Sequence, residues 1–486
     1  MEGSFRIVNN RPIAFLLLVA AAATALSPAL CSATEYFVDN TLSTSGSGTS
    51  SSALKTIQEG LNRAGPGDVV TVRGSASGRT YLETLSFPVG GTGAQPITLR
   101  ANPGEVVIIT GATGISLNVD QDNLVLDGLT IDNAGGSSDA VKINANHVTI
   151  KNCEIRNGSR EGIAIERASD VTIQDCSIHD FMWISGGTRN DAHCIMIDTG
   201  ISSTINGIVI QRCTIQRCSG DGTQIFGVTG QSISSYAKNV SFLNNTFIDG
   251  TASNSGQTEN ALDLKAADGV VIRGNTMRGY TNNKTIVVQK GCRNIAVEDN
   301  VMSDGLSGIE MREEGGAAFV QINQRIVGNV FQNYSTYAIK LDTVNNATIA
   351  NNTLADIGGQ GFRFEASTSL PSLATGLIQN NVSYNVSSSP VGTNLLSGVV
   401  LGHNGWFQAS AGGLAGTGDK TGTNPGFVDE AGGNYHLASG SPCIDAGVVV
   451  GRPYSGAAPD LGAFEYASSG GSDTTPPAAV TDLGPR

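Results

Sequence analysis

Basic residues are scarce in this sequence. Its 486 residues include 29 Lys and Arg against 42 Asp and Glu, which gives a formal net charge of −13. Non-specific nucleic-acid binding needs a basic surface, so this composition argues against a nucleic-acid partner. An acidic substrate would also be repelled by the protein as a whole, unless a bound cation offset the repulsion.

Cysteine motifs that bind zinc are missing. The chain has eight cysteines, one of them Cys31, and no pair has the CxxC spacing or the spacing of zinc ligands. Cys153, Cys176 and Cys213 occupy one position of a repeat, in KNCEI, QDCSI and QRCTI. Repeats stacked about 4.8 Å apart would bring these thiols within disulfide reach. Disulfides and a ladder of buried thiols both remain open.

No segment beyond the N-terminal leader has the length and apolarity of a membrane span. The leader carries Arg6 and Arg11, then an apolar run over 13–26, and ends in Cys31-Ser32-Ala33. That run is short for a membrane helix, and the small residues at its end are typical of a signal-peptide cleavage site. We therefore expect residues 1–33 to be removed from a secreted or cell-surface protein that has no membrane partner.

An internal repeat dominates the remainder of the chain. Segments such as VTIKNCEI (148–155), VTIQDCSI (171–178) and ATIANNTL (347–354) alternate apolar and polar residues and then turn at Asn, Asp or Gly. The ten matched turn residues lie at 128, 152, 175, 212, 244, 274, 299, 328, 351 and 380. Asparagines at one turn position could hydrogen-bond to each other from coil to coil.

A second short strand precedes most of these units, and we call it the lead strand of each coil. The lead strands read AVKIN (140–144), GIAIE, CIMID, GTQIF, ALDLK, TIVVQ, GIEMR, AIKLD and GFRFE (361–365). Short strands in a repeat of this length leave no room for crossover helices, so each strand should pair with its copies in neighbouring coils. The sequence predicts an all-β fold, a parallel β-helix of about ten coils. The signatures of leucine-rich repeats and β-propellers are absent.

The ends of such a solenoid must be covered. Residues 52–64 predict an amphipathic capping helix, with Leu54, Ile57 and Leu61 on one face. We divide the chain into the following ranges: a signal peptide over 1–33, an N-terminal strand and capping helix over 34–110, repeats over 111–384, irregular C-terminal coils over 385–466, and a Ser/Gly/Pro linker or tail over 467–486. We expect a monomer.

Two long insertions enter the lead-strand row two coils apart. The segments before Ile195 and Leu262 are longer than the corresponding segments of the other coils. Insertions in a solenoid often gather on its binding face. The segments carry residues that we expect to contact substrate: Trp183, Arg189, His193 and Asn260.

Outward-facing acidic residues lie beneath these insertions. Alternation along the lead strands points one residue in two away from the core. At about 4.8 Å per coil, four carboxylates could surround one hard cation, and Ca²⁺ takes six to eight oxygen ligands. The candidate calcium ligands are Asp198, Asp221, Glu259 and Asp263.

A carboxylate cluster with a neighbouring lysine favours β-elimination on an acidic polysaccharide. Calcium would neutralise the uronate carboxylate, and Lys265 would remove the proton at C5. Arg312, two coils further along, could bind the substrate carboxylate with two hydrogen bonds, and Glu310 could contact the sugar. We therefore hypothesise that Lys265 and Arg312 are catalytic.

Both ends of the chain resemble known proteins. VDN…GSGTSSSALKTIQEGLNRAGPGDVVTVRG and GTGAQPITLRANPGEVVIITG near the start, and NPGFVDEAGGNYHLASGSPCIDAG…PDLGAFEY near the end, resemble secreted right-handed β-helix proteins of the pectate-lyase-like superfamily. The resemblance covers about residues 35–466 and implies a right-handed coil. TTPPAAVTDL, close to the C-terminus, resembles the lead into a fibronectin-type-III-like module.

Family-nine polysaccharide lyases are the nearest comparison within that superfamily. The resemblance implies an acid-rich D-D-G-x-D strand, where this chain has Gly220-Asp221-Gly222-Thr223-Gln224 and keeps one acid. A lysine is implied in the following coil, where Asp263 stands and Lys265 comes two residues later. Only Asp221, and more weakly Lys265, carry over from the family pattern.

Two other functions remain open. A glycoside hydrolase could use Asp263 and Glu310, about 10 Å apart across two coils, slightly beyond the roughly 6.5–9.5 Å of inverting enzymes. The NTD, DD, GHG and RxK signatures implied for β-helix polygalacturonases are not found in that order. A non-catalytic, glycan-binding or adhesive solenoid would need no such residues. In each case the expected partner is a polysaccharide.

Overall fold

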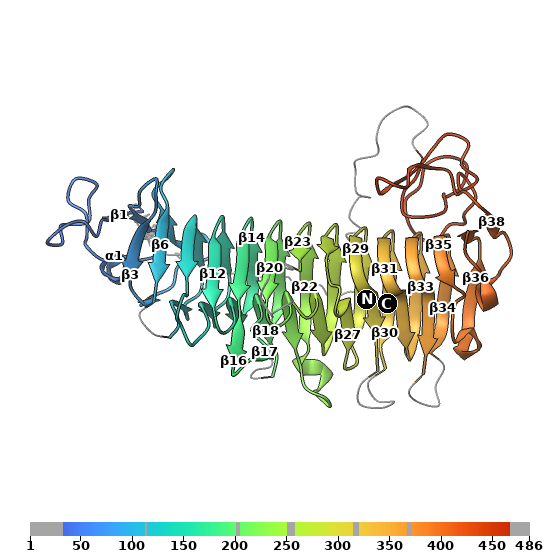
Figure 1. Ribbon diagram of the computed structural model, residues 1–486. Helices are drawn as coiled ribbons and strands as arrows, with labels where there is room; N and C mark the ends of the chain where they lie inside the picture. Colours follow the sequence, from blue (N-terminus) through green and yellow to red (C-terminus); the bar gives the residue numbers. More distant parts are fainter. Residues whose placement is uncertain are drawn as a thin grey trace, which may run out of the picture.

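The computed structural model describes residues 33–466 except 112–113, 201–204, 250–257, 314–319 and 367–371. Figure 1 shows an elongated solenoid whose coils stack along one axis. Equivalent strands of neighbouring coils pair in parallel, so the predicted all-β parallel β-helix is confirmed. The leader up to residue 32 and the tail over 467–486 lie outside the described residues.

The first row of strands contains the repeat units found in the sequence. Ten of its fourteen strands are the ten predicted repeats, and β1, β2, β5 and β36 extend the same sheet at its ends. Its members are β1 (Glu35–Val38), β2 (Val69–Val72), β5 (Ile97–Ala101), β8 (Leu124–Asp127), β11 (Val148–Lys151), β14 (Ser169–Gln174), β19 (Asn206–Gln211), β22 (Ala237–Leu243), β25 (Ala267–Arg273), β28 (Arg293–Glu298), β30 (Ile322–Val327), β32 (Val344–Ala350), β34 (Leu373–Gln379) and β36 (Leu396–Gly402).

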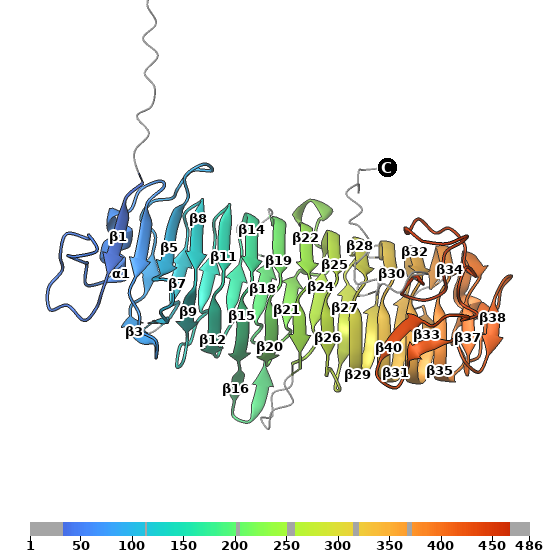
Figure 2. The same ribbon diagram turned by 90° about the horizontal axis from the view of Figure 1, so that it is seen from above.

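The lead strands form a second row. Their members are β4 (Leu85–Ser86), β7 (Leu117–Val119), β10 (Val141–Ile143), β13 (Ile163–Ile165), β18 (Ile195–Asp198), β21 (Thr223–Phe226), β24 (Leu262–Lys265), β27 (Lys284–Gln289) and the second halves of β29 (Val301–Met311), β31 (Val330–Asp342) and β33 (Thr353–Glu365). Figure 2 shows β18, β21, β24 and β27 following one another along the axis.

A third row lies between the other two along the chain. It is formed by β3 (Arg79–Leu82), β6 (Val107–Thr110), β9 (Leu129–Asp132), β12 (Glu154–Gly158), β15 (Ser177–Phe181), β20 (Thr214–Cys218), β23 (Thr246–Ile248), β26 (Thr276–Arg278), the first halves of β29, β31 and β33, and then β35 (Val382–Ser388), β37 (Gly405–Phe407) and β38 (Lys420–Gly422). Its pairs are also parallel, for example Ile155 with Ile178.

Inward-facing Ile, Val, Leu and Phe side chains fill a continuous core that runs through the coils. Asparagines hydrogen-bond up the axis as predicted, but at the position after the expected turn residue. Each side-chain Nδ2 donates to Oδ1 of the next asparagine at 2.9–3.1 Å, through Asn245, Asn275, Asn300, Asn329, Asn352, Asn381 and Asn404. The ladder ties seven coils together inside the core.

The same position holds cysteines in the earlier coils. Cys153, Cys176 and Cys213 are buried free thiols, so these coils form the thiol ladder rather than the disulfide alternative. A disulfide that the sequence analysis missed joins Cys194 to Cys218. Cys194 ends the first long insertion and Cys218 ends β20, so the bond ties this insertion to the next coil.

Both ends of the core are covered. The predicted capping helix is α1 (Ile57–Arg63), shorter than the expected 52–64 because Thr56 caps its N-terminus through a capping box with Glu59. At the other end, β36, β37 and β38 add further coils, and the chain after β38 folds back along the solenoid, where Arg452 forms an ion pair with Asp299 at 2.9 Å. Figure 1 shows this segment rising above β35 and β38. The division of the chain into ranges stays a prediction.

Several short elements complete the structure. They are the two-stranded hairpin β16 (Trp183–Ser185) and β17 (Thr188–Asn190), the 3-10 turns η1 (Ile233–Ser235), η3 (Thr393–Leu395) and η4 (Gly412–Leu414), and the pair β39 (Phe427–Asp429) and β40 (Asn434–Leu437). Among the described residues, no helix has the length and apolar character that crossing a membrane requires.

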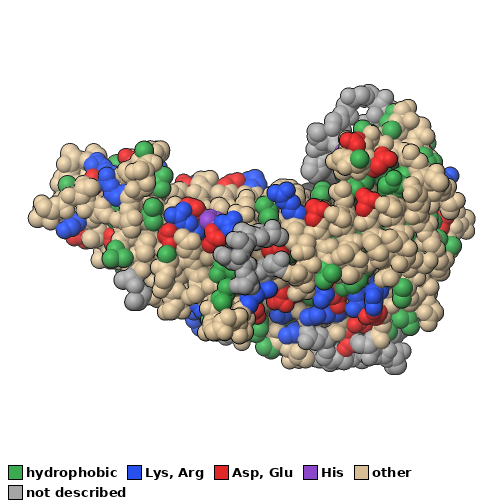
Figure 3. All heavy atoms as spheres, in the orientation of Figure 1, with side chains coloured by type: hydrophobic (Ala, Val, Ile, Leu, Met, Phe, Trp, Pro, Cys, Tyr) green, Lys and Arg blue, Asp and Glu red, His purple; other side chains and the backbone are tan. Residues whose placement is uncertain are grey.

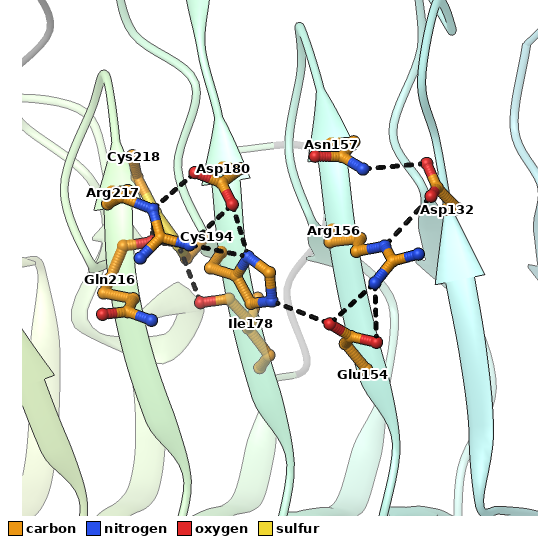
Figure 4. A network of polar contacts seen from close by, with 11 residues as sticks. Asp132, Glu154, Arg156, Asn157, Ile178, Asp180, Cys194, Gln216, Arg217 and Cys218 are labelled. Carbon is orange, nitrogen blue, oxygen red and sulfur yellow. Dashed lines mark hydrogen bonds and ion pairs between the residues drawn. A yellow bond between two sulfur atoms is a disulfide. The ribbon is translucent and has the colours of Figure 1, made fainter. Parts of the chain in front are cut away.

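The outer face of the third row carries a ladder of charges in its early coils. His179 Nδ1 lies 2.6 Å from Asp180 and its Nε2 lies 3.2 Å from Glu154. The hydrogen bond from Arg217 is the main cause that lowers the pKa of Asp180. Arg156 forms an ion pair with Glu154 at 3.0 Å. Figure 4 shows these contacts linking neighbouring strands beside the Cys194–Cys218 disulfide. Because each group is paired with its neighbours, we assign this ladder a structural role.

Candidate functional site

The lead strands bring their outward residues into the two rows that the alternation predicted. The strand registers align one row as Lys142, Ala164, Met196, Gln224, Asp263, Val287, Glu310, Lys340 and Arg363. In the second row, Asp198 is opposite Phe226, Lys265 is opposite Gln289, and Asp342 is opposite Glu365. Residues far apart in the chain thus become neighbours along one wall.

Asp221 is completely buried and lies two residues before β21. Its Oδ1 accepts hydrogen bonds from the backbone N–H of Asn260 at 3.1 Å and from Asn260 Nδ2 at 2.7 Å, and its Oδ2 accepts one from Gln224 Nε2 at 2.8 Å. Burial, and then the charges of Asp263 and Glu259, raise the pKa of Asp221 well above its ordinary value. Three of the four expected metal ligands therefore lie in one electrostatic neighbourhood.

His193 lies in the coil before Asp221, next to it in the stack, and is almost fully buried. Its Nδ1 accepts a hydrogen bond from the backbone N–H of Asp221 at 2.7 Å, which places the proton of the neutral ring on Nε2. Burial, followed by the positive charges of Lys265, Arg160 and Arg189, lowers its pKa to about 3. His193 is therefore a neutral imidazole at physiological pH and a hydrogen-bond donor through Nε2.

Lys265 and Asp263 form an ion pair on β24. Lys265 Nζ lies 3.0 Å from Asp263 Oδ2, and it also lies 5.9 Å from the centre of the Phe226 ring. The pairing follows from the sequence, because residues two apart on a strand project from the same face. The Phe226 contact was not foreseen, although Phe226 occupies the adjacent position of the predicted row.

Gln289 is a residue of this site that sequence reasoning missed. Its Nε2 donates to Asp263 Oδ1 at 2.8 Å, and its Oε1 accepts from a terminal N–H of Arg312 at 3.0 Å. Gln289 is 2% exposed. It therefore connects Arg312 with the Asp263–Lys265 pair, and its place beside Lys265 in the outward row was the signal that could have identified it.

Other expected site residues lie at the edges of this cluster. Burial raises the pKa of Asp198, and the charges that act on this carboxyl are those of Glu166 and Lys142. Both of these residues belong to earlier coils. Glu259 accepts a hydrogen bond from Asn283 Nδ2 at 3.4 Å. The structure thus groups Glu259 with Asp221 and associates Asp198 with a different set of charges.

The first long insertion is the hairpin of β16 and β17. The guanidinium carbon of Arg160 lies 4.7 Å from the centre of the Trp183 ring, over its face. Arg189 Nε donates a hydrogen bond to the backbone carbonyl of Ser219. The hairpin thereby packs against the segment that leads to Asp221. Most of the second insertion, residues 250–257, lies outside the described residues.

Glu310 belongs to a second charged cluster, further along the row. Its Oε2 accepts a hydrogen bond from Tyr337 Oη at 2.8 Å, and its Oε1 lies 3.1 Å from Lys340 Nζ. Burial alone would raise the pKa of Glu310, but Lys340, Tyr337 and Lys284 together hold it below its ordinary value. Glu310 is thus an ionised carboxylate surrounded by donors.

Two of the four residues expected to bind calcium have partners on both carboxylate oxygens. Both carboxylate oxygens of Asp221 and both of Asp263 accept hydrogen bonds or an ion pair from Asn260, Gln224, Gln289 and Lys265. Within the described ranges, no group of three or more His, Cys, Asp or Glu side chains is placed to hold a metal ion. As these side chains stand, the oxygens of Asp221 and Asp263 face protein donors, and calcium binding stays a prediction.

The arrangement can bind and polarise an anionic group. Lys265 and Arg312 supply two cations, His193 supplies a neutral donor, and Asp263 is held by an amide as well as by Lys265. Low solvent exposure strengthens each of these interactions. Such a set suits a substrate whose negative charge increases during the reaction.

Comparison with known proteins agrees with the fold. The family profile described as "Pel9A-like, right handed beta helix region" matches residues 36–313, and the profile "Periplasmic copper-binding protein (NosD)" matches residues 251–400. No curated protein matches the sequence.

Several solved structures are similar to the chain. A PL6 family polysaccharide lyase from Pseudopedobacter saltans is 17% identical, with a TM-score of 0.53, over 72% of this chain and 90% of that one. XylC in complex with xylose is 11% identical, with a TM-score of 0.51, over 81% and 87% of the two chains. Pectate lyase Pel9A is 17% identical over 89% and 96%, with a TM-score of 0.49.

Proposed function

Because the chain belongs to the Pel9A-like right-handed β-helix family, we propose that it is a polysaccharide lyase that cleaves an acidic, uronate-containing polysaccharide by β-elimination. The observation that supports this proposal most directly is the connection between two cations on the lead-strand row. Arg312 bonds Gln289, Gln289 bonds Asp263, and Asp263 pairs with Lys265. Two linked cations over buried carboxylates suit an acidic substrate better than a neutral one.

In the proposed reaction, Arg312 binds the uronate carboxylate through two N–H groups. Removal of the C5 proton increases the negative charge on that carboxylate, and Arg312 stabilises the increase. Lys265 first gives up the proton of its ion-paired ammonium to solvent and then takes the C5 proton, and the ammonium that re-forms is again paired with Asp263, 3.0 Å away. The bond between C4 and the glycosidic oxygen then breaks, a C4–C5 double bond forms, and the leaving oxygen takes up a proton from water.

We also propose that the protein is secreted or held at the cell surface. The leader over 1–33 supports export. The Cys194–Cys218 disulfide supports it as well, because disulfides persist mainly in oxidising compartments. Reduction of this bond should loosen the hairpin of β16 and β17, since Cys194 follows it directly.

A substrate screen tests the reaction. Pectate, alginate, glycosaminoglycans and neutral glycans are incubated with the protein, with calcium or with a chelator, while ultraviolet absorbance reports new double bonds. Double bonds formed only from acidic polymers would support the lyase. Reducing ends without double bonds would select the hydrolase alternative, and binding without turnover would select the adhesive one. Calcium dependence stays a separate prediction, which loss of activity on chelation would support.

A further inference from the structure

The charged side chains of the lead-strand row are largely paired with one another. Lys340 Nζ, for example, lies 3.1 Å from Glu310 and 2.8 Å from Glu365. Figure 3 shows blue and red side chains gathered together at the lower right, in the region of β27 to β33. Charges of both signs are mixed there, so net charge does not reveal how the row recognises the uncharged parts of a ligand. Uncharged polar groups that lack a partner can do so.

His193 and Gln224 each present one such group. His193 Nδ1 accepts a hydrogen bond from the backbone N–H of Asp221 at 2.7 Å, so the ring carries its proton on Nε2. Gln224 Nε2 donates to Asp221 Oδ2 at 2.8 Å, so Oε1 is the atom of this amide that remains. Among the described residues, none accepts a hydrogen bond from His193 Nε2 and none donates one to Gln224 Oε1. One donor and one acceptor are therefore free.

Both free atoms reach solvent although their residues are buried. His193 is 2% exposed and Gln224 is 5% exposed. In the described part of the chain, the fully enclosed polar atoms that lack a partner include Asn260 Oδ1 and Thr223 Oγ1, but neither His193 Nε2 nor Gln224 Oε1. The two side chains are thus enclosed except at the atoms that could bind a ligand.

Asp221 brings these two side chains together. Its Oδ2 lies 3.6 Å from His193 Nδ1 and 2.8 Å from Gln224 Nε2. Gly220 leaves the room that the imidazole needs, because a Cβ at this position would lie 2.5 Å from His193 Nδ1. The free donor and the free acceptor therefore belong to side chains that meet at one carboxylate oxygen and are held in place from behind.

We infer that His193 and Gln224 form a subsite for a sugar hydroxyl, and that Asp221 is the positioning residue that holds them. A hydroxyl can accept a hydrogen bond from His193 Nε2 and donate one to Gln224 Oε1, whereas a carboxylate only accepts and would leave Oε1 unsatisfied. Gln224 is opposite Asp263 of the next coil, so the subsite lies one coil before the Asp263–Lys265 pair. That the hydroxyl belongs to a glycan rests on the proposed function, whereas the donor and the acceptor do not.

Two substitutions and a matched control test the subsite. His193→Asn keeps an acceptor for the backbone N–H of Asp221 and removes the outward donor, and Gln224→Met removes the outward acceptor at nearly constant volume. Gln211→Met is the control, because Gln211 lies on β19 of the first row, where its amide donates to Gln174 at 3.0 Å. All variants are made in a Lys265→Met background, which blocks the proposed elimination. Affinity electrophoresis measures their binding to polygalacturonate, alginate and a neutral xylan, and thermal unfolding measures their Tm.

Asp221→Asn tests the positioning role. The backbone N–H of Asn260 donates to Oδ1 of residue 221, so an asparagine there keeps its oxygen toward Asn260 and turns its Nδ2 toward Gln224. The Gln224 amide must then rotate, and a donor replaces the outward acceptor. Asp221→Asn should therefore weaken binding as much as Gln224→Met, and the two substitutions together should lose no more than either one alone, a pattern that general loosening of the structure would not produce.

His193→Asn and Gln224→Met should each weaken binding of the tightest-bound polymer about two- to tenfold, the range of one neutral hydrogen bond, while Gln211→Met leaves it unchanged. Their double variant should lose less than the product of the two single losses, because both groups bind one hydroxyl. The inference is overturned if either variant binds as tightly as the control, if the two losses multiply fully, or if no polymer binds. Binding in the expected pattern, without double bonds from the unmodified protein, would refute the lyase and leave the subsite intact.

Discussion

Gln289 donates a hydrogen bond to Asp263 across neighbouring coils, Nε2 to Oδ1 at 2.8 Å, and at the same time accepts one from Arg312. An amide is suited to this position because it offers one donor and one acceptor at fixed separation. Neither a carboxylate nor an ammonium could satisfy both neighbours. The geometry of the proposed catalytic pair therefore depends on a residue that carries no charge.

Gln289→Leu should disrupt this connection. Asp263 would lose a buried donor and Arg312 its acceptor, and one unsatisfied buried group costs about 1–3 kcal/mol. We expect the elimination rate to fall at least tenfold, with a higher KM because Arg312 is no longer held. Gln289→Glu keeps the acceptor for Arg312 but faces Asp263 with like charge, so its KM should stay closer to that of the unmodified enzyme. A purely structural role would lower Tm equally in both variants and leave the two KM values alike.

Replacement of Lys265 by Met should abolish elimination. Loss of a general base costs about 10²–10⁴-fold in rate, whereas Met retains much of the apolar stem against Phe226. Double-bond formation from the best substrate of the screen measures the effect, and circular dichroism confirms the fold. The assignment of Lys265 is refuted if the folded variant keeps the rate of the unmodified protein.

The asparagine ladder should contribute strongly to stability. Asn300→Ala would remove the acceptor Oδ1 from the backbone N–H and Nδ2 of Asn275, remove one donor from Asn329 Oδ1, and free the carbonyl of Ile272. Several buried unsatisfied groups together should cost about 3 kcal/mol or more in unfolding free energy. Asn346, which is exposed and bonds Asn323 at 3.2 Å, is the matched control. Denaturant unfolding should show a change within about 0.5 kcal/mol for Asn346→Ala; equal losses in both variants would contradict a special role for the ladder.

The stability of the protein should fall as pH rises through neutrality, partly because of Glu161. Its pKa rises from the ordinary 4.5 to about 7 in the folded state, so folding favours the protonated form. That contribution is present below pH 4.5 and is lost as pH rises through about 7; a shift of this size corresponds to roughly 3 kcal/mol at most. Glu161→Gln should flatten the curve of unfolding free energy against pH between 4.5 and 8. An unchanged slope would show that another group titrates there.

The sequence specified the stacking of coils and the composition of each row. Strict alternation along short strands allows only one set of side chains to enter the core, so Asp263 and Lys265 had to project outward together and Lys142 had to align with Asp263. The same pattern anticipated an asparagine ladder, although it missed the position by one residue. The expectation that Asp221, Glu259 and Asp263 lie near one another came from this regularity.

Only the tertiary structure decided which groups actually touch. The Cys194–Cys218 disulfide, the Gln289 bridge and the grouping of Asp198 with Glu166 and Lys142 depend on how the insertions pack and on side-chain rotamers between coils. Periodicity sets where a residue lies along the wall to within one coil. It cannot decide whether a carboxylate meets an amide, a lysine or a metal ion, because that choice rests on differences of an ångström or less in a buried, strongly interacting set of groups.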